Sequence, residues 1–295
     1  MYLDERLGRW NDWLTQRWVA FTGRRVDLRQ SPWLNAPIGT PTGIGTAFIE
    51  ELARAEGLVV QREQDAGLLP DFHTLAGPEF DPSAADPNVV DFYARTARYD
   101  LDSWAEWCGL FRPLGRLLAF VFSRRLQQLN VPLTGLDTSR GVSSEVVPLV
   151  DPQTGSVRFT VWLRRLVHTG NVLYAGCYSL ADVPGHSGPC VRVVFPLPNG
   201  NAIVLMRPEL RMDGSMAVVS TGRHFGDPGF YFTVRAGPHH VWAKYVRSLR
   251  ESIHVYSAES GTVRADHALT FWSLPVLRLH YRLRRSTSNH LALAT

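Results

Sequence analysis

The chain has 295 residues, of which 45% are hydrophobic and 20% charged, a composition typical of a globular protein with one large or two ordinary domains. Its formal net charge is +4, and the excess of cations lies after residue 140, where 16 Arg and Lys accompany 9 Asp and Glu. No apolar run reaches the roughly 18–20 residues of a membrane-spanning helix. The N-terminal MYLDERLGRW lacks the apolar core of a secretory signal, so we expect a cytoplasmic protein.

The first 60 residues are expected to be helical. Apolar residues recur there every three or four positions, at Leu3, Leu7, Trp10 and Leu14. Gly23 can end this helix, and a second helix is predicted over residues 46–56, with Gly57 at its end. Residues 61–88 are rich in Pro, Asp and Gly and read as a connector. We therefore predict an N-terminal helical segment and connector over residues 1–88.

The second domain is predicted to span residues 89–295 and to begin with further helix. Asn88 is a candidate N-cap for a helix that starts at Val89. Residues 116–130 are also predicted to be helical, whereas the stretch before Pro113 fits either a helix or a strand.

From Ser143 onward the hydrophobic pattern has a period of two, and turn signals such as Asn199-Gly200 and Asp213-Gly214 separate short runs. Strands are predicted at 144–150, 157–168, 171–181, 190–197, 202–211, 215–221, 229–236, 241–256, 262–272 and 276–284. The run 241–256 also fits a helix. We predict an α+β fold in which a helical layer packs on a large antiparallel β-barrel or strongly curved β-sheet. Its general architecture would be lipocalin-like or START-like.

The last predicted strand, VLRLHYRLRR, places apolar and cationic side chains on opposite faces. Burying an unpaired guanidinium costs several kcal/mol. We therefore place Arg278, Arg282 and Arg284 on the outside. The strand over 157–168 repeats the pattern, with Arg158 and Arg164 opposite its valines. We expect an apolar lumen with at most one or two inward arginines.

Four segments resemble an uncharacterised bacterial family related to the soluble C-terminal domain of YndJ-type proteins. They are DFYARTARYD, RRLQQLNVPL, FPLPNG and LPVLRLHYRL, and the resemblance covers roughly residues 90–285. It omits the membrane region of those longer proteins. The resemblance implies no catalytic residues, because no activity is established for the family.

Candidate catalytic residues are few. Asp100 and Asp102 would share one face of a strand, where paired carboxylates can divide acid and base roles, although ion pairing with nearby arginines is the simpler interpretation. His168 and His224 are candidate general bases. No metal site is predicted, since the three cysteines are widely spaced and no paired His motif occurs. No cofactor is predicted either, because GTPTGIG lacks the Gly-Lys-Ser/Thr ending of a phosphate loop.

Candidate ligand-binding residues are Arg165, Tyr178, Arg223, Asp227 and Tyr231. Arg165, Tyr178 or Arg223 would meet a polar head group. In the loop RHFGDPGFYF, Asp227 would either rigidify the turn through Arg223 or orient Arg223 toward a ligand. The structural interpretation is the simpler one, since Gly-Asp-Pro-Gly is a strong turn signal.

The sequence favours a protein that binds a hydrophobic or amphipathic small molecule, lipid or isoprenoid-like, in an apolar cavity. The abundance of aromatic residues, 11% of the chain, suits such a cavity. The alternative is an isomerase, cyclase or hydrolase that uses acidic or His residues in the cavity. A second alternative is an interaction module that docks on a protein or an anionic membrane surface. Nucleic acid is not an expected partner, because the arginines are dispersed and no nucleic-acid-binding motif is present.

Overall fold

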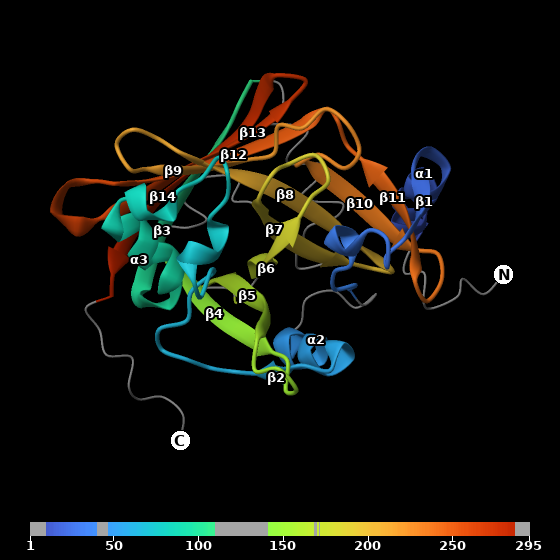
Figure 1. Ribbon diagram of the computed structural model, residues 1–295, viewed down its shortest axis with the longest axis horizontal. Helices are drawn as coiled ribbons and strands as arrows, with labels where there is room; N and C mark the ends of the chain where they lie inside the picture. Colours follow the sequence, from blue (N-terminus) through green and yellow to red (C-terminus); the bar gives the residue numbers. More distant parts are fainter. Residues whose placement is uncertain (1–9, 40–46, 110–140, 168–169, 171, 287–295) are drawn as a thin grey trace.

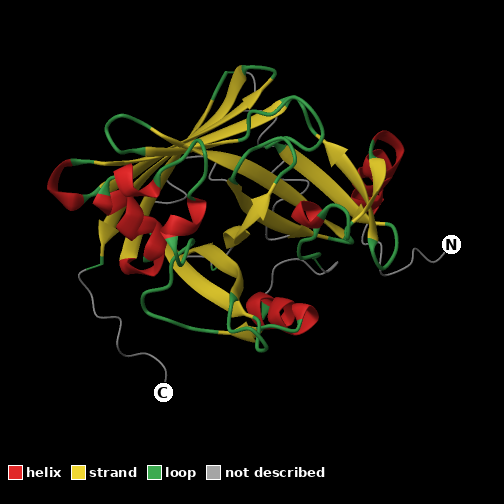
Figure 2. Ribbon diagram, in the orientation of Figure 1, coloured by secondary structure: helices red, strands yellow, loops and turns green. Residues whose placement is uncertain are grey.

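A computed structural model describes residues 10–39, 47–109, 141–167, 170 and 172–286. Within these residues the protein is mostly β, with three α-helices placed around one large antiparallel sheet (Figures 1 and 2). The prediction of a large antiparallel sheet is confirmed. The helix predicted over residues 116–130 lies outside the described residues.

The helices are α1 (Trp10–Thr22), α2 (Phe48–Glu56) and α3 (Pro87–Ala94). The strands are β1 (Arg24–Asp27), β2 (Val59–Val60), β3 (Tyr99–Trp107), β4 (Val142–Val150), β5 (Val157–Leu166), β6 (Val172–Asp182), β7 (Pro189–Leu197), β8 (Gly200–Leu210), β9 (Met216–Val219), β10 (Phe230–Arg235), β11 (His240–Tyr245), β12 (Leu249–Ser257), β13 (Val263–Phe271) and β14 (Leu274–Arg285). Short 3-10 turns occur at Pro32–Leu34, Phe72–Leu75, Pro82–Ala84, Thr96–Arg98 and Glu259–Gly261.

The strand order of the main path is β2-β4-β5-β6-β7-β8-β9-β12-β13-β14-β3. The sheet branches at β8, because residues 200–204 pair with β10 whereas residues 207–210 pair with β9. The branch continues through β11 to β1. The predicted strand over 241–256 is confirmed as strand, interrupted between β11 and β12.

The predicted closed barrel or strongly curved sheet is wrong. The sheet is neither closed nor strongly curled, and no ladder in the described residues joins edge strand β3 to β4. The reason lies in the space that a barrel would leave as its lumen. Side chains of residues 66–99 fill it, among them Phe72, Phe80, Phe92 and Tyr93. The aromatic residues, whose abundance suggested a large cavity, instead pack in the core and occupy that space.

The central strands are buried on both faces. On one face, Trp162, Tyr178 and Val193 pack with residues 66–99 and with Leu283 of β14. On the other face, a second core packs against α2 and the 3-10 turn at residues 32–34. Strands of a sheet that is covered on both faces do not alternate between buried and exposed residues. Arg164 of β5 and Arg192 of β7 are therefore buried.

The end of α2 and the start of α3 follow the usual rules of helix capping. Gly57 adopts a left-handed φ of 69° and ends α2, as predicted. At the start of α3 the N-cap is Asp86, not the predicted Asn88, and its carboxylate accepts a hydrogen bond from the Asn88 backbone N–H at 2.7 Å. Pro87 occupies the first turn, where its missing N–H is not needed.

The ambiguous stretch before Pro113 forms β3, which pairs with β14 at the sheet edge. Leu277 and Leu283 of β14 are buried, whereas Arg278, Arg282 and Arg284 are exposed, as predicted from the alternation. Asp102 of β3 accepts hydrogen bonds from Arg282 at 2.8 Å and Arg284 at 3.0 Å. The cationic face of the last strand is therefore a solvated ion-pair ladder.

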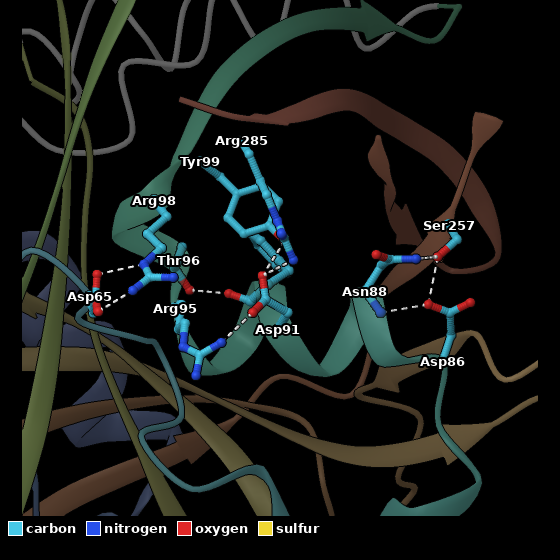
Figure 3. Close-up of polar contacts among 11 residues, drawn as sticks. Asp65, Asp86, Asn88, Asp91, Arg95, Thr96, Arg98, Tyr99, Ser257 and Arg285 are labelled. Atoms are coloured by element: carbon cyan, nitrogen blue, oxygen red, sulfur yellow. Dashed lines mark hydrogen bonds and ion pairs between the residues drawn. The ribbon is translucent and has the colours of Figure 1, made fainter. Parts of the chain in front are cut away.

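A polar network fastens α3 to this edge (Figure 3). Asp91 accepts hydrogen bonds from Arg95 at 2.8 Å, from the Tyr99 hydroxyl at 2.7 Å and from Arg285 at 2.9 Å. Burial acts to raise the pKa of Asp91, but the Tyr99 hydrogen bond and the two arginines outweigh it and hold this pKa below its usual value. Asp91 thus ties α3 to β3 and β14 at one point.

Replacing Asp91 should destabilise the protein. We expect Asp91→Asn to lower the free energy of unfolding by about 1–3 kcal/mol at pH 7, since charge-assisted hydrogen bonds are lost from a side chain that is only 12% exposed. The contribution is fully present above the unfolded-state pKa of about 3.9 and disappears as the pH falls through the lower folded-state value. Urea unfolding between pH 7 and pH 3 measures both effects. Asp100→Asn, at an exposed position of β3, is the control and should change stability by less than about 0.5 kcal/mol.

Candidate functional site: a cavity around Arg164

A small cavity of about 60 Å³ lies inside the core that residues 66–99 form with the sheet. Strands from both ends of the sheet line it, β5–β8 from one end and β12–β14 from the other. Its walls are mostly apolar, with Phe92, Leu101 and Val193 among them. Seven polar or phenolic side chains also line it: Tyr93, Arg164, Tyr174, Tyr178, Glu251, His267 and Tyr281. An apolar pocket with a few convergent polar groups is the usual form of a small-molecule site.

Arg164 is the central polar group of the cavity. This side chain on β5 is 7% exposed, and its guanidinium lies over three aromatic rings. The guanidinium carbon is 4.2 Å from the ring centroid of Trp162, 4.1 Å from that of Tyr174 and 5.4 Å from that of Tyr281. In the described part of the chain, Nε has no hydrogen-bond acceptor. Burial acts to lower the pKa of Arg164, but Tyr281, Tyr174 and Tyr178, with a hydrogen-bonding interaction of the Tyr281 hydroxyl, raise it overall. Arg164 is therefore a buried cation held by π-faces and by the Tyr281 hydroxyl.

The tyrosines beside Arg164 are neutral hydrogen-bond donors. The hydroxyls of Tyr174 and Tyr178 share a hydrogen bond of 2.6 Å. Burial raises the pKa of Tyr178 to about 12 and that of Tyr174 well above its usual value. Both phenols keep their protons at neutral pH, so they add no negative charge that would neutralise Arg164.

An acid and a histidine meet on another wall. Glu251 of β12 is 8% exposed, and its Oε1 lies 2.5 Å from Nε2 of His267 on β13. The two strands are paired, and Glu251 lies opposite Leu269. His267 is two residues before Leu269, so its side chain is on the same face and diagonal to Glu251. A carboxylate that orients an imidazole is a common arrangement for a general base.

A groove of about 670 Å³ adjoins the cavity. It forms where β5 and β6 separate: Thr160 and Tyr178 are their last paired residues, and β6 continues beside β7 alone. Leu68 and Tyr178 line both the cavity and the groove. These two side chains therefore lie where the small interior site meets the larger open one.

Arg192 of β7 lies at the groove and contrasts with Arg164. Its Nε donates to the Ser179 hydroxyl at 2.9 Å, and its Nη1 donates to the Asn35 carbonyl at 2.9 Å and the Trp33 carbonyl at 3.3 Å. Burial and the nearby Arg158 lower the pKa of Arg192 to about 10. Arg192 is therefore a buried arginine whose donors have acceptors, and it joins the 3-10 turn at residues 32–34 to the sheet.

The candidate catalytic residues do not converge on this cavity. Asp100 and Asp102 share one face of β3, as expected, but that face is exposed, and Asp102 pairs with arginines of β14. His224 is exposed in the loop after β9. His168 lies outside the described residues.

The candidate ligand-binding residues are divided among three places. Tyr178 lines the cavity. Arg165 points to the opposite face of β5 from Arg164 and pairs with Glu145 at 3.5 Å. Arg223, Asp227 and Tyr231 lie together around the loop before β10, away from the cavity.

That loop has a structural arrangement of its own. Asp227 Oδ2 accepts from the backbone N–H groups of Arg223 and His224, each at 2.8 Å. The Tyr231 hydroxyl donates to the Asp227 carbonyl at 2.6 Å and accepts from Gly226 N–H at 3.0 Å. Asp227 thus rigidifies the turn through the backbone and not through the Arg223 guanidinium.

Sequence reasoning missed Arg164, Glu251 and His267. The alternation of β5 placed Arg164 on the solvent side, and this is wrong because both faces of β5 are buried. The available signal was Trp162, two residues before Arg164 and hence on the same face. Of the aromatic partners, Tyr174 lies directly opposite Arg164 on the next strand, β6, whereas Tyr281 on β14 is distant in sequence.

Among the described residues no group of three or more His, Cys, Asp and Glu side chains is arranged to hold a metal ion. Cys177 and Cys190 are buried, and burial raises the pKa of each thiol to about 12. No helix in the described ranges has both the length and the apolar character required to cross a bilayer. Comparison of the chain with family models, curated proteins and solved structures found no match.

The two buried arginines should respond oppositely to replacement by methionine. Arg164→Met removes a cation without a hydrogen-bonded counter-ion, so we expect unchanged stability or a gain of about 1 kcal/mol or more. Arg192→Met leaves the buried Trp33 carbonyl without this donor and removes the part-buried hydrogen bond to Asn35, and should cost about 2–3 kcal/mol. Urea unfolding of both variants measures the difference. Equal losses in the two variants would show that the aromatic rings alone make Arg164 a stabilising anchor.

Proposed function

We propose that the protein binds an amphipathic small molecule with an anionic head group. The head group would occupy the cavity beside Arg164, and the apolar part would extend past Leu68 and Tyr178 into the groove. The observation that carries the proposal is the buried Arg164 cation, whose Nε has no acceptor in the described part of the chain.

Charge supports an anionic head group. Glu251, the carboxylate in the same cavity, contacts His267 and not the guanidinium of Arg164 in the described residues. A buried guanidinium without a paired carboxylate is costly, and a ligand anion would provide a paired counter-ion. The neutral hydroxyls of Tyr174 and Tyr178 could donate hydrogen bonds to the same anion. Carboxylate and phosphate share this chemistry.

Size supports a divided ligand. The cavity of about 60 Å³ is less than a tenth of the size of the groove of about 670 Å³, so the cavity suits a head group and the groove suits the longer apolar part. The groove of about 670 Å³ lies in the usual range of ligand pockets, roughly 300–1,000 Å³. A chain leaving the cavity would therefore find room beyond Tyr178.

Titration calorimetry with dodecanoate, dodecyl phosphate and dodecanol tests this proposal. We expect at least one of the two anions to bind at least about ten times more tightly than the alcohol, because an ion pair in a buried site is worth 1.4 kcal/mol or more. Arg164→Met should abolish this preference. The matched control is Arg165→Met, which changes the neighbouring residue on the opposite face and should bind like the wild type. Equal affinity for the alcohol and both anions would contradict the proposal.

A second candidate function, an enzyme, is favoured by the contact between Glu251 and His267 in the same cavity. Here His267 would move a proton of the bound molecule while Glu251 orients the imidazole. Wild-type protein would then retain product, whereas Glu251→Gln would retain substrate. The molecules extracted from each form should differ in chromatographic retention and fragmentation, because a proton shift produces an isomer of equal mass. Identical ligands in the two forms would contradict an enzymatic role for this pair.

A further inference from the structure

The hairpin that joins β13 to β14 ends in large apolar side chains. Phe271 and Leu274 form the last pair of the ladder, and Trp272 and Ser273 make the two-residue turn between them. Phe271 is 39% exposed, Trp272 66% and Leu274 58%. This hairpin tip, residues 271–274, projects at the top of the view in Figure 1.

The backbone of the tip is unusual for these residues. Trp272 has a φ of 48° and Ser273 a φ of 70°, both in the left-handed region. Two-residue hairpin turns of this kind normally carry Asn or Gly, because other side chains are strained there. The backbone N–H of Trp272 donates to the Ser248 carbonyl at 2.8 Å, which holds the turn against the start of β12. An indole is therefore presented to solvent at a position that favours a small polar residue.

Cations flank the tip. Arg250 on β12 lies opposite Thr270, and Arg247 lies in the turn just before β12. Both side chains are exposed. Glu106 of β3, on the adjoining edge, is paired with Arg278 at 3.9 Å and so contributes little free negative charge. The surroundings of the tip are thus basic.

We infer that the β13–β14 hairpin tip docks on an anionic membrane surface, with Trp272 and Leu274 entering the interface and Arg247 and Arg250 contacting lipid head groups. Tryptophan favours the membrane–water interface because its ring is apolar with one polar N–H. Each arginine near an anionic surface adds attraction. The combination of an apolar tip and flanking cations fits a charged lipid surface better than a neutral one.

Co-sedimentation with vesicles tests this inference. The wild-type protein should bind vesicles of equal parts phosphatidylcholine and phosphatidylglycerol and bind pure phosphatidylcholine much more weakly. Trp272→Asn combined with Leu274→Ser should reduce binding at least about ten-fold, because the apolar surface is lost. Asn suits the left-handed turn, so this variant should keep the wild-type melting temperature.

Charge is tested separately. Arg247→Gln and Arg250→Gln should each weaken binding to the anionic vesicles by about five-fold, and added salt should reduce the difference from the wild type. Binding that is equal on both vesicle types, or unchanged by the Trp272→Asn/Leu274→Ser variant, would overturn the inference. So would a dimer that this variant converts to a monomer without any change in vesicle binding, because the tip would then be a contact between two copies. All these variants should still bind dodecanoate as the wild type does, since none lies at the cavity.

Discussion

An antiparallel sheet with two buried faces needs other parts of the chain to shield each face from water, and most features of this protein follow from that requirement. Residues 66–99 cover one face with aromatic side chains such as Phe92 and Tyr93. Helix α2 and the turn at residues 32–34 cover the other. Because these segments fill much of the interior, the described residues leave a small cavity there, in which Arg164, Tyr178 and Glu251 are each less than 9% exposed. The position of Arg164 has chemical consequences for this reason.

The strands were largely predictable from sequence, because a period of two is a local property. In β14, the alternation of Leu277 and Leu283 with Arg282 and Arg284 gave both the strand and its sidedness. The end of α2 was likewise predictable, since Gly57 adopts the left-handed conformation that glycine tolerates best. The open sheet was not predictable in this way. Whether its edges close depends on the packing of a connector that has no hydrophobic period of its own.

The candidate site was only partly predictable, for a related reason. Tyr178 was identified, but Arg164 was assigned to solvent because a cation on an alternating strand usually lies there. Its burial depends on Tyr174, directly opposite it on the adjacent strand β6, and on Tyr281 of β14, a strand far from β5 in the strand order. In contrast, the turn around Asp227 was predicted from its Gly-Asp-Pro-Gly sequence, because its hydrogen bonds connect residues within a few positions of each other. The local pattern indicated the turn but not its partners, which are backbone N–H groups and not the Arg223 guanidinium.

Arg164 and Arg192 show why burial alone does not assign a function. Both lie on the same sheet and are less than 9% exposed. Arg192 donates to carbonyls that would otherwise be unsatisfied, so packing and hydrogen bonding explain it fully. Arg164 has three aromatic contacts, each worth about 0.5–2 kcal/mol, against a desolvation penalty of several kcal/mol. These opposing quantities are of similar size, so the rings make the buried cation tolerable without making it favourable. An anion in the cavity would shift this balance decisively, because it would interact with an already desolvated charge whose position is fixed by packing. A ligand anion would therefore bind by supplying Arg164 with the paired counter-ion that the fold does not provide.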